Sequence, residues 1–109
     1  SGQQGNVQKG AETGAIKMAD KTLQVLVKGR VQGVFFRAFV KQNAQALGVK
    51  GFVRNRPDGS VEAVCFGNKN VLSKLLKKIK QGPMLARVEK VEAKEIAKPE
   101  LNESFEVVN

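Results

Sequence analysis

The stretch GRVQGVFFR, residues 29–37, separates a segment with the period of a strand from a segment with the period of a helix. In residues 23–28 apolar and polar side chains alternate, as in a strand with one buried face. In residues 36–47 apolar side chains recur every three or four positions, as on one face of a helix, and Gly48 follows where a helix commonly ends. The glycines of the stretch break the strand pattern. The sequence therefore predicts a strand, a glycine-containing loop and a helix in succession.

Two further strands follow this unit. Residues 49–55 and residues 60–66 both favour strands, and the RPDG sequence between them is typical of a turn, so the pair predicts a hairpin. A second amphipathic helix comes next, with Asn68 or Asn70 as its N-terminal cap and Gly82 at its end.

The last part of the chain predicts two more strands. In residues 86–97 the alternation slips between Val88 and Val91, where we expect a bulge or a late start of the strand. Residues 104–108 predict a short final strand, with Phe105 and Val107 on one face. The order β-α-β-β-α-β, with the short strand last, indicates an α+β protein. We expect a ferredoxin-like split β-α-β sandwich, an antiparallel sheet with two helices on one face.

Length and composition fit one domain, residues 21–109, of a protein of 109 residues that is 41% hydrophobic. Residues 1–20 have no period, and we interpret them as a disordered N-terminal extension, with residues 1–17 as a tag remnant before a native start at Met18. No apolar run approaches the roughly 20 residues of a membrane-spanning helix. The single cysteine, Cys65, is expected to be a buried apolar side chain. It fits a reducing compartment, and we expect a cytoplasmic protein.

Charge and missing residue types narrow the function. The formal net charge of +9 attracts anions, from a phosphate ester to a nucleic acid, although a lysine-rich solvated surface explains it equally well. The sequence has no histidine, which excludes an imidazole base and histidine metal ligands. Cys65 lacks the arginine six positions later that a thiolate phosphatase would need, and no Walker-type loop is present.

Residues 29–37 also contain the groups of an anion site. Consecutive backbone amides of a glycine-containing loop at the start of a helix can enclose an anion. Arg37 would lie in the first helical turn, where the helix dipole disfavours a cation unless an anion is bound. Its guanidinium fork matches two phosphate or carboxylate oxygens. An ordinary turn, with Phe36 in the core and Arg37 paired with a surface acid, fits the stretch as well, and Asn55 by itself suggests a turn former.

Two stretches together resemble the signatures of the acylphosphatase family. The first signature is Gly, any residue, Val-Gln-Gly-Val, a variable position, an aromatic residue or Met, and Arg, and it is met without a gap from Gly29 to Arg37. The second signature is met at Gly51, Phe52, Asn55, Gly59, Val61 and Gly67. Phe52 stands where other members often carry Trp or Tyr. The resemblance covers residues 22–108 and agrees with the predicted order of strands and helices.

The resemblance implies an enzyme that hydrolyses the carboxyl–phosphate anhydride bond of an acyl phosphate to a carboxylate and inorganic phosphate, without metal or cofactor. It implies that Asn55 positions the attacking water and that Arg37 holds the phosphate. The backbone amides that would hold the phosphate with Arg37 are those of Gly29, Arg30, Val31, Gln32, Gly33, Val34, Phe35 and Phe36. Expected partners are a small anionic acyl phosphate and inorganic phosphate, the latter as product and competitive inhibitor. We expect a monomer that binds neither nucleic acid nor membrane.

The residue types agree with this chemistry. An amide such as that of Asn55 offers a donor and an acceptor, which orient a water but do not deprotonate it. Positioning and charge stabilisation are the main contributions of a protein to phosphoryl transfer. The cations that flank the two signatures either raise the local positive potential or are simply solvated; they are Lys28, Arg30, Arg54 and Arg56.

Three alternatives remain at the level of sequence. RNA-recognition domains share the order of elements, but the chain has six Phe, no Tyr and no Trp, so stacking platforms are scarce. A non-catalytic or channelling domain of the same family, as in larger carbamoyl-transferring maturation proteins, is the second. A small-ligand sensor of ferredoxin-like fold, which usually works as a dimer, is the third.

Overall fold

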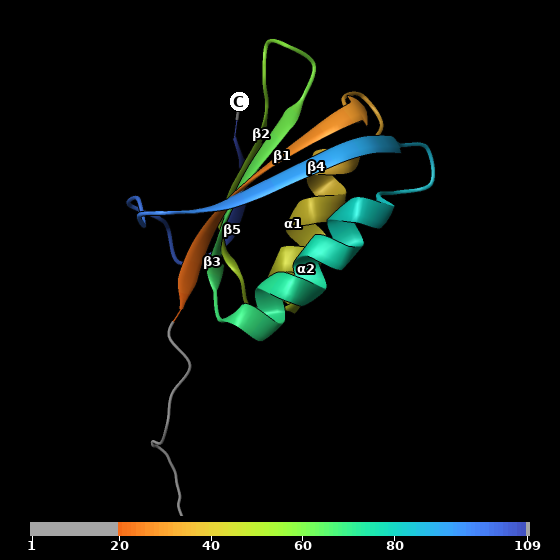
Figure 1. The fold of residues 1–109 in the computed structure, drawn as a ribbon. Helices are drawn as coiled ribbons and strands as arrows, with labels where there is room; N and C mark the ends of the chain where they lie inside the picture. Colours follow the sequence, from red (N-terminus) through yellow and green to blue (C-terminus); the bar gives the residue numbers. More distant parts are fainter. Residues whose placement is uncertain (1–19, 109) are drawn as a thin grey trace, which may run out of the picture.

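The computed structural model describes residues 20–108, in which two helices cover one face of a five-stranded sheet (Figure 1). The expectations of disorder and of a tag before residue 20 lie outside the described residues. In chain order the elements are β1 Lys21–Arg30, α1 Phe36–Ala46, β2 Lys50–Asn55, β3 Val61–Gly67, α2 Lys69–Gln81, β4 Arg87–Ile96 and β5 Phe105–Val108. This order and the two-layer arrangement confirm the predicted ferredoxin-like α+β class. No helix in the described part of the chain is long and apolar enough to cross a membrane.

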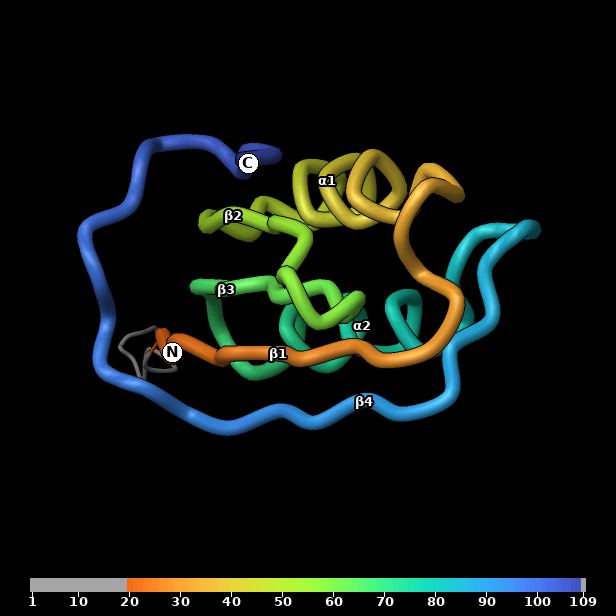
Figure 2. Tube along the Cα trace, turned by 90° about the horizontal axis from the view of Figure 1, so that it is seen from above, coloured from red at the N-terminus to blue at the C-terminus, as the bar shows by residue number. Residues whose placement is uncertain are grey.

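The strands lie in the order β4-β1-β3-β2-β5. β1 pairs antiparallel with both β3 and β4, and β2 pairs antiparallel with β3. The expectation of a wholly antiparallel sheet is wrong at one edge, where β5 pairs in parallel with β2. The cause is the path of residues 97–104, which pass around the sheet from β4 to the opposite edge (Figure 2). β5 therefore starts at the end of the sheet where β4 stops, which is also where β2 starts.

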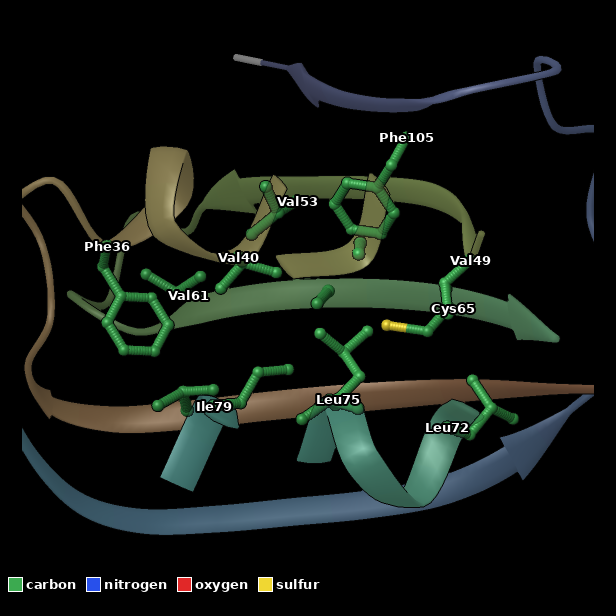
Figure 3. Close-up of a cluster of buried hydrophobic side chains, with 14 of the residues drawn as sticks. Phe36, Val40, Val49, Val53, Val61, Cys65, Leu72, Leu75, Ile79 and Phe105 are labelled. Carbon is green, nitrogen blue, oxygen red and sulfur yellow. The ribbon is translucent and has the colours of Figure 1, made fainter. Parts of the chain in front are cut away.

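The core lies between the sheet and the helices (Figure 3). Phe36 and Val40 of α1 and Ile79 of α2 are almost fully buried, because the helical period places them on the faces that meet the sheet. Cys65 of β3 is buried among them, as predicted, and desolvation raises the pKa of its thiol to about 12. The thiol is therefore protonated at neutral pH and behaves as a small apolar side chain.

The helix ends follow the predicted signals. The Asn68 Oδ1 accepts a hydrogen bond of 3.0 Å from the backbone N–H of Val71, so Asn68 caps α2. Gly82 ends α2 with a φ of 69°, and Gly48 follows α1 with a φ of 72°. Both glycines adopt a left-handed backbone that other residues adopt only at a cost.

The predicted irregularity of the fourth strand is a β-bulge. Lys28 is opposite Lys90, but the next residue of β1, Gly29, is opposite Val88, so Glu89 is the extra residue. The expectation that β1 breaks at Gly29 is wrong, because β1 continues to Arg30, which is paired with Arg87. The bulge brings the backbone of β4 so close to Gly29 that a Cβ there would overlap the Arg87 carbonyl oxygen and the Glu89 nitrogen.

Replacing Gly29 with alanine is expected to destabilise the fold by more than about 2 kcal/mol, because the methyl group meets backbone atoms that cannot move aside and φ is 129°. The matched control is Gly48→Ala, which also has a positive φ but has open space around its Cβ, and which should cost about 1 kcal/mol. Urea unfolding of the two variants measures the difference. Equal losses for both variants would contradict the steric argument.

Candidate active site

The loop between β1 and α1 comprises residues 31–35 and lies at the same end of the sheet as the turn between β2 and β3 (Figure 1). The side chain of Gln32 joins them, because its Nε2 donates hydrogen bonds to the carbonyl oxygens of Arg56, at 2.8 Å, and Ser60, at 2.9 Å. Sequence reasoning considered only the backbone amide of Gln32 and missed this role. The sequence signal for it was a long polar side chain between Val31 and Gly33, in a loop whose other side chains are apolar.

The backbone of the loop alternates in handedness. Gly33 has a φ of 73° and Phe35 a φ of 63°, whereas Val34 between them does not have a positive φ. Such alternation turns neighbouring N–H groups toward a common point, which is how backbone nests bind anions. Phe35 is the one non-glycine residue in residues 20–108 with a positive φ, a conformation that is uncommon for a bulky side chain.

The N-terminus of α1 differs from that of α2. Phe35 occupies its N-cap position and makes no side-chain hydrogen bond to the helix, and the first turn of α1 contains no acidic residue. The N–H groups that every helix leaves unpaired in its first turn therefore lack a side-chain acceptor from the cap, whereas Asn68 supplies one at α2. This start of α1 is electrostatically suited to a negative ligand.

A pocket of about 340 Å³ opens at this end of the molecule. Its wall consists of residues from the loop, from the first turn of α1 and from the ends of β2 and β5. These residues are Val31, Gly33, Phe35, Phe36, Arg37, Ala38, Asn55 and Val107. The structure thus brings Arg37 and Asn55, which are far apart in sequence, to one pocket. Gly29 and Arg30 are in β1 and do not line it, and Val107 was not anticipated as part of it.

Asn55 carries an unusual oxygen. Its Oδ1 is buried and accepts no hydrogen bond from any described residue. A buried polar atom without a partner costs free energy, so such atoms are rare and often mark a place where a ligand or water binds. Asn55 lines the pocket together with Arg37.

The two arginines on either side of Asn55 are held by Glu62 of β3. The Arg54 Nε lies 2.6 Å from the Glu62 Oε1, and the Arg56 Nη1 lies 3.9 Å from the same oxygen. Gln24 Nε2 donates to the other oxygen at 2.6 Å. Burial raises the pKa of the Glu62 carboxyl, but these hydrogen bonds and the positive charges outweigh burial and hold the pKa below its usual value. Arg54 and Arg56 are therefore not simply solvated, as one sequence interpretation had it.

The described residues contain no group of three or more His, Cys, Asp or Glu side chains that could hold a metal ion. Arg37 is half-buried in the first turn of α1 and is the one charged side chain among the described residues that line the pocket. The site therefore combines one guanidinium, one amide side chain and the backbone amides of a loop and a helix start.

Comparison with known proteins agrees with these features. The family profile described as Acylphosphatase matches residues 23–107. The chain belongs to the acylphosphatase family. It is thereby placed among hydrolases that act on acid anhydrides, and the sequence resemblance is confirmed.

Several relatives of this acylphosphatase-family chain are similar over most of their length. A protein of Rhodopseudomonas palustris named Acylphosphatase is 48% identical over 84 residues, which are 77% of this chain and 84% of that protein. One of Thermus thermophilus with the same name is 56% identical over 70 residues, or 64% of this chain and 80% of that protein.

Solved structures show the same fold. The crystal structure of the acylphosphatase of Bacillus subtilis has a TM-score of 0.77 and 34% identity, and the match covers 81% of this chain and 98% of that one. Full-length HypF, in its phosphate- and nucleotide-bound form, matches with a TM-score of 0.74 and 26% identity, over 84% of this chain but 12% of that one. A unit of this fold therefore occurs both as nearly a whole protein and as a small part of a larger one.

Proposed function

We propose that this protein hydrolyses acyl phosphates to a carboxylate and inorganic phosphate in the pocket at the start of α1, and that no metal takes part. The observation that carries the proposal is the meeting of Arg37 and Asn55 in one pocket, with the buried Asn55 Oδ1 lacking a partner among the described residues. The family and the names of its relatives support the reaction. The roles of Arg37 and Asn55 are those that the family resemblance implies, and their meeting in one pocket supports them.

Arg37 and the backbone amides of the loop would hold the phosphoryl group. The guanidinium fork binds two of its oxygens, and the N–H groups of the loop and of the first turn of α1 bind the remainder. Of the backbone amides that the resemblance implies, we propose those from Val31 onward, because the loop between β1 and α1 starts at Val31, whereas Gly29 and Arg30 belong to β1. These donors stabilise the charge on the phosphoryl oxygens. Such stabilisation is a main contribution of a protein to the catalysis of phosphoryl transfer.

Asn55 would position the nucleophile. Its Oδ1 accepts one hydrogen bond from a water, which leaves the lone pair of the water directed at phosphorus. The water oxygen forms a bond to phosphorus, the bond between phosphorus and the bridging oxygen breaks, and the carboxylate leaves with the electron pair. One proton of the water passes to a phosphate oxygen of the substrate and the other stays on the attacking oxygen, so the released phosphate carries both and no histidine is needed. We infer that the enzyme acts as a monomer and that inorganic phosphate, its product, is a competitive inhibitor.

The direct test is the hydrolysis of benzoyl phosphate, followed by ultraviolet absorbance, in the presence and absence of EDTA. We expect turnover that EDTA leaves unchanged, because positioning and charge stabilisation come from protein groups. Circular dichroism should show that the assayed sample is folded. A folded sample without turnover would refute the enzymatic proposal, and loss of turnover in EDTA that Mg²⁺ restores would refute the metal-free mechanism.

Arg37→Ala is expected to lower kcat/KM for benzoyl phosphate by about 10²–10³-fold, the usual effect of removing one stabilising donor. Arg37→Lys should not restore the activity, because an ammonium cannot bind two oxygens as a planar fork does. Lys41→Ala is the matched control, since it removes a cation from the same helix about one turn later and does not line the pocket. Near-normal rates for the lysine variant would contradict the bidentate role.

Asn55→Ala is expected to lower kcat by about 10²–10³-fold while inorganic phosphate still inhibits with an unchanged inhibition constant, because the water and not the phosphate loses its partner. Steady-state kinetics at several phosphate concentrations measure both quantities. Asn70→Ala, an exposed asparagine of α2, is the control and should leave both unchanged. If phosphate inhibition disappears together with kcat, Asn55 is a phosphate ligand instead.

A further inference from the structure

Glu62 is a buried carboxylate on the face of the sheet that the helices leave uncovered. It is 5% exposed, and its neighbours in β3, Val61 and Ala63, belong to the core between the sheet and the helices. Because side chains alternate along a strand, Glu62 points away from that core. Removing a carboxylate from water is costly, and a buried ion pair is weak evidence for a gain in stability. The position of Glu62 therefore calls for a role besides stabilising the fold.

The partners of Glu62 include the residues on both sides of Asn55. The Glu62 Oε1 accepts a hydrogen bond of 2.6 Å from the Arg54 Nε and forms an ion pair of 3.9 Å with the Arg56 Nη1. The Gln24 Nε2 of β1 donates to the Oε2 at 2.6 Å, so both oxygens of the carboxylate are engaged. The side chains of Arg54 and Arg56 are partly exposed, whereas the carboxylate is buried. The carboxylate is therefore the anchor to which the two arginines are attached.

Asn55 is the last residue of β2, and its pairing with Val61 is the last between β2 and β3. The Asn55 Oδ1 accepts no hydrogen bond from any described residue, so the backbone that carries the side chain decides where this oxygen lies. That backbone is flanked by Arg54 and Arg56. Because adjacent residues of a strand point to opposite faces, Arg54 can contact Glu62 while Asn55 lines the pocket. A shift of the backbone at this point would move the oxygen.

We propose that Glu62 is a positioning residue for Asn55. From the sheet face opposite to the pocket it holds the end of β2 through Arg54 and Arg56, and it thereby fixes the direction of the amide side chain between them. Glu62 is not among the residues that line the pocket. The inference rests on the proposed function, because it concerns the group that would position the water. Glu62 would act together with Gln32, which holds the Arg56 carbonyl oxygen from the loop.

A double-mutant cycle with Asn55 tests this role. Glu62→Ala is expected to lower kcat for benzoyl phosphate by about 10–100-fold, because a small displacement of a positioning group has effects of this size. The inhibition constant of inorganic phosphate should stay unchanged, since Arg37 and the loop keep their places. In the Asn55→Ala background, Glu62→Ala should lower kcat no further, because the side chain that it positions is gone. An equal loss of kcat in both backgrounds would refute the inference.

Glu103→Ala is the matched control. The Glu103 Oε1 lies 3.2 Å from the Nζ of Lys50, the first residue of β2. This variant therefore removes a carboxylate that is paired with the same strand at the end away from Asn55, and it should leave kcat unchanged. Glu62→Gln removes the charge but keeps the shape of the side chain. It replaces Glu62→Ala in the cycle, with the same expectation, if the alanine variant does not fold by circular dichroism.

A spectroscopic measurement separates this inference from the proposed function. In proton–nitrogen correlation spectra, the side-chain NH₂ signal of Asn55 is identified by its loss in Asn55→Ala. It should shift or broaden in Glu62→Ala and stay in place in Glu103→Ala. If the parent hydrolyses no acyl phosphate but the signal responds to Glu62→Ala, the proposed function fails and the link between Glu62 and Asn55 stands.

Two results would overturn the positioning role. One is an Asn55 side-chain signal that is the same in the parent and in Glu62→Ala, whatever the enzymatic assay shows. The other is a Glu62→Ala variant in which kcat and phosphate binding fall by the same factor. In either case Glu62 supports the fold as a whole and has no specific connection to Asn55.

Discussion

Two hydrogen bonds from the side chain of Gln32 hold the loop before α1 against the turn after β2. The acceptors are the carbonyl oxygens of Arg56, which directly follows Asn55, and of Ser60, which directly precedes β3. We call this pair of hydrogen bonds the Gln32 clamp. These bonds add a direct link between the loop that precedes Arg37 and the turn that follows Asn55. The clamp therefore fixes the distance between the group that would bind phosphate and the group that would bind water, and such positioning is what catalysis without a strong base depends on.

The charge of the site follows from the same loop. Its alternating backbone and the uncapped start of α1 provide N–H groups for an anion, and Arg37 adds one positive charge. Glu62 forms ion pairs with Arg54 of β2 and with Arg56, which follows β2, so its negative charge offsets part of the positive charge near the pocket. The net charge of the chain is +9, yet the pocket itself presents one guanidinium. The overall charge therefore does not describe the charge of the pocket.

The two layers, the element order and the bulge of β4 could be predicted because each depends on a local pattern. Helical and strand periods mark the core faces, and the slip between Val88 and Val91 marks the extra residue Glu89. The parallel pairing of β5 could not be predicted, because it depends on the end of the sheet at which residues 97–104 cross. The role of Gly29 was misjudged for a similar reason. Its missing side chain leaves room for the backbone of β4, a neighbour nearly sixty positions away in the sequence.

For the site, the sequence by itself determined which chemical groups are available, namely a guanidinium, an amide side chain and a glycine-containing loop, in a chain without histidine. It also determined the family to which these groups point. Only the tertiary structure decided that Arg37 and Asn55 share a pocket, that Gln32 clamps the loop and that Phe35 and Val107 stand beside them. The physical reason is that residue type and period are local properties of the chain. The contacts of a pocket are instead set by the packing of elements that are remote in sequence.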